Sequence, residues 1–187
     1  MEKTRTIQNE DKGLIVNTQN PSGIVITGHR RNIGKSLYEY FPNSVGLCRT
    51  TGMNINEPKE VIDFLPKNTK VFINNAHEKF AQTELLFELC SSGFTGHIIN
   101  IGSTATERLK RGQHTKDFWY GVSKMSLYHA NDIMFYHGYN TTYCGLCNIN
   151  VGAGGLNGLD VSHVPPLIEY IINAPFRIKE ISIGESS

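Results

Sequence analysis

The sequence predicts an α/β fold in which a doubly wound, parallel sheet of six to seven strands carries helices on both faces. Short apolar runs alternate with longer amphipathic segments along most of the chain, as in repeated strand–helix–strand units. The 187 residues are 39% hydrophobic and 19% charged, which is enough apolar chain to bury one sizeable core. We therefore expect a single domain over residues 21–187, preceded by a polar tail at residues 1–20.

The strands and helices are expected to follow one another in regular order. In the first half, apolar runs predict strands at residues 23–27, 45–49 and 70–74. The segments between and after them predict helices at about residues 33–41, 57–65 and 80–91, with a short extended piece at 53–55. In the second half, strands are expected at residues 97–101, 142–149 and 178–183. A polar loop follows the first of these strands, a long helix covers about residues 117–137, and Pro165 and Pro166 open a last helix. Within the tail, residues 13–16 can form a short extra strand.

Charge and hydropathy exclude several classes of partner. Eighteen Lys and Arg are balanced by 17 Asp and Glu, so a net charge of +1 gives no attraction to nucleic acid or to a membrane surface. No apolar run approaches the roughly 20 residues of a membrane helix, and the tail lacks the apolar centre of a signal peptide. We expect a cytoplasmic protein that does not enter a membrane.

Cysteine and histidine usage predicts neither disulfides nor a metal. The four cysteines are too few and too scattered for a disulfide framework, so reduced thiols are expected. Cys144 and Cys147 have the spacing of a redox pair or a zinc half-site, but they lie in a strand-like run, and we interpret the spacing as coincidence. The histidines form no metal-binding cluster in the sequence.

A loop between the first strand and the first helix predicts a phosphate site. The segment Thr27-Gly28-His29-Arg30-Arg31-Asn32-Ile33-Gly34-Lys35-Ser36 places backbone N–H groups and the positive end of a helix dipole where an anion binds. Asn32 stands where a glycine is often found, and asparagine tolerates left-handed backbone conformations better than most residues. The residues expected to contact a phosphorylated cofactor are Gly28, His29, Arg30, Arg31, Asn32, Ile33 and Gly34.

The end of this segment, Gly34-Lys35-Ser36, also permits a nucleotide kinase. A P-loop has four residues between its two glycines, whereas residues 29–33 separate Gly28 from Gly34 here, one residue more. An enzyme of this kind also needs an aspartate at the end of another core strand to hold magnesium. The expected strands that end at Asn74 and Ile101 offer none, so the P-loop kinase is kept as an alternative.

The residues after the second strand indicate which dinucleotide binds. In Rossmann-type loops an acidic residue about 20 positions onward binds the ribose 2′-OH of NAD, and a basic residue accommodates the 2′-phosphate of NADP. That distance from Gly28 reaches Cys48 and Arg49, with no carboxylate beside them. Because Arg30 and Arg31 add positive charge in the loop, the sequence favours NADP(H) over NAD(H).

Tyr120 and Lys124 form the expected proton-transfer pair. Their spacing places both side chains on one face of the long helix, and a nearby cation favours the charged form of a phenol. Ser103 follows an apolar strand at the carboxyl edge, where open α/β sheets bind ligands. Its hydroxyl is expected to hold a substrate carbonyl while Tyr120 protonates the oxygen.

Taken in order, these features resemble the short-chain dehydrogenase/reductase family. The resemblance spans residues 23–184 and is carried by Thr27, Gly28, Ile33, Gly34, Asn74, Asn75, Ala76, Ser103, Tyr120 and Lys124. It implies that Tyr120 is the general acid/base and that Ser103 orients the substrate. It also implies that Lys124 binds the nicotinamide ribose and lowers the pKa of the tyrosine. Asn74, Asn75 and Ala76 are expected to contact the cofactor, with Asn74 and Ala76 lining its cleft.

The chain departs from the family pattern at several positions. Asn32 and His77 replace glycines, and Val151-Gly152 stands where Pro-Gly is usual. The family's additional catalytic asparagine has no obvious counterpart, and Gln82 is only a candidate. We interpret His77 as a half-exposed loop histidine, with contact to cofactor or substrate as the alternative.

Three functional hypotheses follow. The leading one is an NADP(H)-dependent oxidoreductase that transfers a hydride between nicotinamide and a small carbonyl or alcohol substrate. A non-catalytic NADP(H)-binding or sensing module is the second, and the P-loop kinase is the third.

The long helix is apolar on more sides than a sheet alone would cover. In the family this helix commonly pairs with a partner's, which implies a homodimer or homotetramer through the Tyr120/Lys124 helix; cover by the tail is the alternative.

Overall fold

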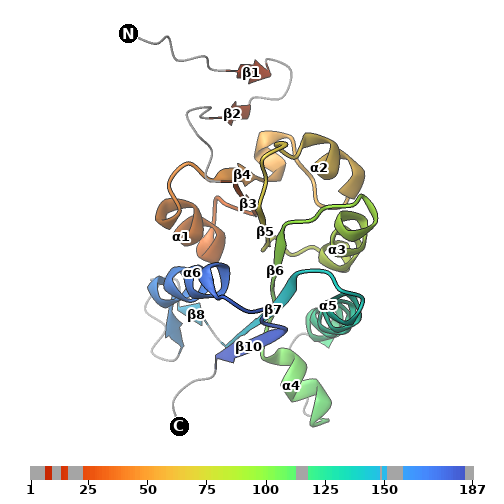
Figure 1. Cartoon of the computed structure of the whole chain (residues 1–187). Helices are drawn as coiled ribbons and strands as arrows, with labels where there is room; N and C mark the ends of the chain where they lie inside the picture. The colour runs from red at the N-terminus through yellow and green to blue at the C-terminus, as the bar shows by residue number, and fades with distance from the viewer. Residues whose placement is uncertain are drawn as a thin grey trace.

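A six-stranded parallel sheet forms the centre of the molecule in the order β10-β7-β6-β5-β3-β4 (Figure 1). The computed structural model describes residues 7–9, 14–16, 23–112, 118–147, 149–150 and 158–183. The strands of the sheet are β3 (Ile24–Thr27), β4 (Val45–Leu47), β5 (Val71–Asn74), β6 (His97–Ile101), β7 (Thr141–Leu146) and β10 (Glu180–Ile183). Every pairing among them is parallel. The predicted α/β class with a parallel sheet is confirmed.

Helices cover both faces of this sheet (Figure 1). One face carries α1 (Asn32–Tyr40) and α6 (Val164–Asn173), and the other carries α2 (Pro58–Phe64), α3 (Ala81–Ser91) and α5 (Phe118–Tyr136). The two cores follow from the alternation of side chains along each strand. In β5, for example, Phe72 packs into the core beneath α3 and α5, whereas Val71 and Ile73 pack into the core beneath α1 and α6.

The strand order predicts a ligand site at the carboxyl ends of β3 and β5. From β3 the chain passes through α1 to β4 on one side, and then through α2 to β5 on the other side of β3. A crevice forms at such a reversal because the connections leave the two neighbouring strands in opposite directions. Gly28 and Asn75 follow directly after these strands, so the predicted phosphate loop opens into the crevice.

Buried polar contacts fix how α5 lies on the sheet. The Oδ1 atom of Asn131 accepts hydrogen bonds from Asn100 Nδ2 at 3.0 Å and from Thr141 Oγ1 at 2.6 Å. Asn100 and Thr141 belong to adjacent strands, so this one amide joins the helix to both β6 and β7. Lys124 lies seven residues, or about two helical turns, before Asn131 and is therefore directed to the same face of α5.

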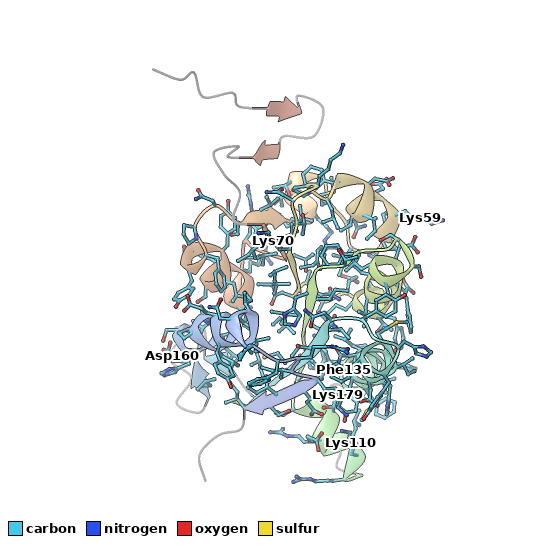
Figure 2. All side chains as sticks on the ribbon, viewed as in Figure 1. Lys59, Lys70, Lys110, Phe135, Asp160 and Lys179 are labelled. Atoms are coloured by element: carbon cyan, nitrogen blue, oxygen red, sulfur yellow. The ribbon has the colours of Figure 1, made fainter. Side chains whose placement is uncertain are left out.

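A short helix that the sequence did not predict follows Ser103. Residues expected to form a polar loop instead begin with α4 (Ala105–Lys110). Its last residue, Lys110, is labelled in Figure 2. This residue packs on α5, because Lys110 Nζ lies 3.7 Å from the centroid of the Tyr128 ring, and it also pairs with Glu107 within α4. Polar composition alone did not distinguish this amphipathic turn of helix from a loop.

Smaller differences concern strand ends and short strands. β7 ends at Leu146 rather than at residue 149, and the chain instead forms β8 (Ile149–Asn150), which pairs with β9 (Leu159–Asp160). The extended piece expected at residues 53–55 joins no strand pairing, although Met53 and Ile55 are buried. In the tail, β2 (Leu14–Val16) pairs with β1 (Ile7–Asn9).

Among the described helices, none is both long and apolar enough to cross a membrane.

The packing of α5 gives a first prediction for stability. Leu127, on α5, is fully buried against the sheet, whereas Tyr170 on α6 is 54% exposed. We predict that Leu127→Ala lowers the free energy of unfolding by about 2–5 kcal/mol, because it leaves a cavity in the core. Urea unfolding measures this change, with Tyr170→Ala as the surface control at less than about 1 kcal/mol. Equal losses in the two variants would contradict the packing of this helix.

Candidate active site

A cavity of about 750 Å³ opens at the carboxyl edge of the sheet, a size typical of ligand sites. Residues that follow β3, β4, β5 and β6 form its walls, together with the start of α5. They are Gly28, Arg30, Arg31, Asn32, Ile33, Leu47, Cys48, Arg49, Thr50, Met53, Asn54, Ile55, Asn75, Ala76, His77, Glu78, Ile101, Gly102, Tyr120 and Lys124. Cationic side chains outnumber the single carboxylate, Glu78, in this lining, which favours an anionic ligand.

The loop after β3 has the backbone geometry of a phosphate cradle. Gly28 has φ 70° and Asn32 has φ 47°, so both adopt the left-handed conformation that makes the turn tight. A Cβ atom at Gly34 would overlap the carbonyl oxygen of Gly28, so only glycine permits this close approach. The first turn of the nine-residue helix α1 starts at Asn32 and has no side-chain cap. Its backbone N–H groups and dipole suit the pyrophosphate of a dinucleotide.

The adjacent loop after β5 is bonded to the end of β3. Thr27 Oγ1 accepts hydrogen bonds from the backbone N–H groups of Asn75 at 2.8 Å and Ala76 at 2.9 Å. The Asn75 side chain in turn donates to the carbonyl oxygen of Thr27 at 2.9 Å. These contacts hold the two walls of the crevice at a fixed separation.

Most of the predicted cofactor residues line the cavity, but three do not. His29 packs instead over Gly46 and against the Tyr38 ring at 4.9 Å between centroids. Gly34 lies behind Gly28, where it permits the tight turn. Asn74, expected to line the cleft, is fully buried, because its side chain donates to the Gln82 carbonyl at 2.8 Å and to Asn100 Oδ1 at 3.0 Å.

Lys124 reaches the cavity through a buried polar site. Its Nζ atom donates to Gln82 Oε1 at 2.6 Å and to the carbonyl oxygen of Ile101 at 2.8 Å. Burial lowers the pKa of Lys124 to about 7, because neither acceptor carries a charge that would compensate for lost hydration. The ammonium therefore titrates near neutrality.

Gln82 is fixed so that its oxygen faces the lysine. Its Nε2 atom donates to the carbonyl oxygen of Asn74 at 2.7 Å, which leaves Oε1 to accept from Lys124. Only 2% of Gln82 is exposed. The sequence indicated Gln82 only as a candidate for the missing asparagine, and the structure places it in direct contact with the lysine.

Tyr120 lies at the cavity wall, near both Lys124 and His77. Lys124 Nζ is 5.6 Å from the centroid of the Tyr120 ring, and the His77 ring meets it edge to face at 4.9 Å between centroids. Tyr120 is the third residue of α5, so it enters the site from the first turn of that helix. The expected pair is thus brought to one place, beside the predicted phosphate loop.

Ser103 is held at the end of β6 but is not among the lining residues. Its backbone N–H donates to Tyr143 Oη at 3.0 Å, and Tyr143 donates back to the Ser103 carbonyl at 3.2 Å. Burial raises the pKa of Tyr143 to about 12, so this hydroxyl keeps its proton. The Ser103 hydroxyl accepts from the N–H of Ala105 at 3.1 Å, and its own hydrogen is not used in that bond.

Comparison with known proteins finds solved structures of similar fold, but no match among family models or curated proteins. Serine dehydrogenase from Escherichia coli is similar in structure, with 15% identity, a TM-score of 0.63, and coverage of 86% of this chain and 96% of that chain. A short-chain dehydrogenase from Burkholderia cenocepacia J2315 in complex with NADP gives 14% identity, a TM-score of 0.66 and 87% coverage of each chain. The chain has the short-chain dehydrogenase/reductase fold.

A third similar structure carries the other dinucleotide. The 3-ketoacyl-(acyl-carrier-protein) reductase from Brucella melitensis complexed with NADH is 11% identical, with a TM-score of 0.64 and coverage of 86% of this chain and 95% of that chain. The similar structures therefore include complexes with NADP and with NADH.

The lowered pKa of Lys124 predicts how stability varies with pH. Between about pH 7 and the ordinary lysine pKa of 10.5, the unfolded chain holds a proton at this site that the folded chain has lost. Stability therefore rises with pH across this window. We predict that wild type gains stability relative to Lys124→Met between pH 6 and pH 9, as measured by urea unfolding at several pH values.

The matched control for this measurement is Lys59→Met, on the exposed surface of α2 (Figure 2). Its difference from wild type is expected to stay constant over the same pH range. A constant difference between wild type and Lys124→Met would show that Lys124 is not desolvated in the folded protein.

Proposed function

We propose that this chain is an NADP(H)-dependent oxidoreductase of the short-chain dehydrogenase/reductase family that acts on a small carbonyl or alcohol. The observation that carries the proposal is that Tyr120 and Lys124 line the same cavity as the tight glycine loop after β3. A phosphate cradle and a proton-transfer pair at one switch point suit a reaction on a bound dinucleotide. The similar fold of dehydrogenases agrees with this proposal.

Residues of the loop and of the opposite wall would hold the cofactor. The N–H groups of the loop and of the α1 terminus would bind the pyrophosphate, and Ile33, Asn75 and Ala76, which line the same cavity, would contact the rest of the dinucleotide. Arg49, with Arg30 and Arg31, would bind the 2′-phosphate. Lys124 would bind the nicotinamide ribose from its buried position.

Proton transfer is assigned to Tyr120. When bound, the nicotinamide supplies or accepts a hydride at the substrate carbon. In the reducing direction the Tyr120 hydroxyl gives its proton to the carbonyl oxygen, and in the oxidising direction the phenolate takes it back. Lys124 stabilises the phenolate when its ammonium is charged. Ser103 orients the carbonyl by donating the hydroxyl hydrogen that its bond with Ala105 leaves available.

A substitution at Tyr120 tests this assignment. We predict that Tyr120→Phe lowers kcat for NADPH-dependent carbonyl reduction by at least about 100-fold, because it removes the general acid. The NADPH dissociation constant should change by less than about threefold. Absorbance at the nicotinamide band measures turnover, and calorimetry measures binding. The control is Tyr136→Phe, a tyrosine of the same helix that is 74% exposed.

The outcome of this test also separates the leading proposal from a second candidate. A non-catalytic NADP(H)-binding module is favoured by one observation, that Ser103 is not among the residues lining the cavity. Tight NADPH binding with no reduction of a broad panel of aldehydes and ketones by wild type would support that module. Full activity in Tyr120→Phe would instead remove tyrosine from the mechanism.

Arg49 tests the preference for NADP(H). Its guanidinium is 3.8 Å from the Glu78 carboxylate, and its side chain is 74% exposed, so this ion pair is weak enough to be replaced by a phosphate. We predict that Arg49→Ser raises the dissociation constant of NADPH by about 10- to 100-fold, the value of a charge-assisted hydrogen bond. The dissociation constant of NADH should stay within about twofold.

The matched control is Arg111→Ser, an exposed arginine at the end of α4. It is expected to change neither dissociation constant. If Arg49→Ser weakens NADH and NADPH equally, the residue binds a part common to both cofactors and does not select between them.

Assembly and location belong to the same proposal. Four large apolar or aromatic residues of α5 are between 49% and 74% exposed: Phe118, Trp119, Ile133 and Tyr136. Exposed apolar side chains along one helix are typical of a protein interface. We therefore assign a homodimer or homotetramer to the chain through α5, in the cytoplasm, where its cysteines stay reduced.

A further inference from the structure

His77 stands at a position where the sequence departs from the family pattern, and it contacts the proposed general acid. It follows the end of β5 and lines the cavity. Its ring meets the Tyr120 ring at 4.9 Å between centroids, with 67° between the two planes. This edge-to-face geometry is favourable for two aromatic rings.

The imidazole is also held by a hydrogen bond to a second residue of α5. His77 Nε2 lies 2.9 Å from Ser123 Oγ, and Ser123 Oγ donates its hydrogen to the carbonyl oxygen of Tyr120 at 2.8 Å. A serine hydroxyl has one hydrogen, so the bond to His77 is one in which Nε2–H donates. Nε2 carries a hydrogen in this neutral tautomer and also in the imidazolium, so the bond persists in both protonation states.

The backbone beside His77 is also fixed. Ala76, the preceding residue, donates its N–H to Thr27 Oγ1 at 2.9 Å. The Lys124 ammonium, 5.6 Å from the centroid of the Tyr120 ring, is held by Gln82 and by the carbonyl oxygen of Ile101. The Tyr120 ring therefore has two neighbours that are each hydrogen-bonded in place.

Tyr120 needs a fixed orientation because of the chemistry assigned to it. A general acid must keep its hydroxyl near the reacting oxygen, and a displacement of about 1 Å is enough to cost a large factor in rate.

We propose that His77 is a positioning residue for Tyr120, held by Ser123 so that its ring fixes the orientation of the phenol in the cavity. The inference rests on the proposed function. The inference adds His77, which the family pattern does not supply, to the residues that serve Tyr120. Ser123 then acts together with His77, because it holds the imidazole. His77 then acts through Tyr120 and not on the cofactor.

Kinetics give the first test, at saturating NADPH. We predict that His77→Ala lowers kcat for carbonyl reduction by about 10- to 100-fold with the KM for NADPH within about twofold. His77→Phe, which keeps a ring against Tyr120, should recover part of the lost kcat. Ser123→Ala should lower kcat as well, and adding it to His77→Ala should cause little further loss, because both changes remove one unit. His137→Ala, an exposed histidine after α5, is the control.

A second measurement reads the Tyr120 ring without turnover. The chain contains eight tyrosines, and with ring-labelled 13C-tyrosine the Tyr120 resonance is the one absent from Tyr120→Phe. We predict that this resonance shifts in His77→Ala and in Ser123→Ala but not in His137→Ala. If wild type reduces no carbonyl, the proposed function fails, while this shift still decides the role of His77.

Two results would overturn the proposal. One is a Tyr120 resonance that does not move in His77→Ala, because the ring contact is then absent in solution. The other is an unchanged kcat in His77→Ala in an active enzyme, because Tyr120 then needs no support from this side.

Discussion

The buried ammonium of Lys124 is the constraint on which the arrangement of the site depends. A charge taken out of water is costly unless polar groups replace the lost hydration, and here two neutral oxygens do so. One of them, Gln82 Oε1, is aimed correctly only because the other end of its amide is bonded to Asn74. The lysine thus fixes the relative positions of α5, the start of α3 and the ends of β5 and β6.

The same helix is fixed a second time near its middle. Asn131 accepts hydrogen bonds from β6 and β7, two turns beyond Lys124. Two buried polar contacts on one face of α5 determine both its rotation and its position along the sheet. Apolar packing alone would tolerate a rotation of α5 more easily, because the apolar side chains of this helix are spread over several of its sides. Tyr120 then reaches the cavity as a consequence of contacts made elsewhere on the helix.

Local patterns were enough to predict the features that depend on short stretches of chain. The glycine loop after β3 and the spacing of Tyr120 and Lys124 are local, and the structure brings them to one cavity. The φ of 47° at Asn32 gives the physical reason why asparagine replaces a glycine there. The parallel sheet was predicted from the alternation of short apolar and longer amphipathic segments, which is also a local pattern.

Contacts between distant segments were beyond the reach of the sequence. Asn74 ends β5 and Asn75 follows it, and the local pattern did not show that Asn75 lines the cavity while Asn74 is buried. The pairing of Ser103 with Tyr143, 40 positions later, and of His77 with Ser123, 46 positions later, depends on strand order and helix rotation. The helix α4 was missed because its polar residues resemble a loop.

The central claim is that the cavity holds a nicotinamide dinucleotide in the loop after β3, and isothermal titration calorimetry tests it most directly. Wild type would be titrated with NADPH, with NADH and with magnesium ATP under the same conditions. The account predicts saturable NADPH binding at one site per chain, weaker NADH binding, and no requirement for magnesium. Binding of magnesium ATP with no heat from either dinucleotide would contradict it and would assign the loop to a P-loop nucleotide enzyme.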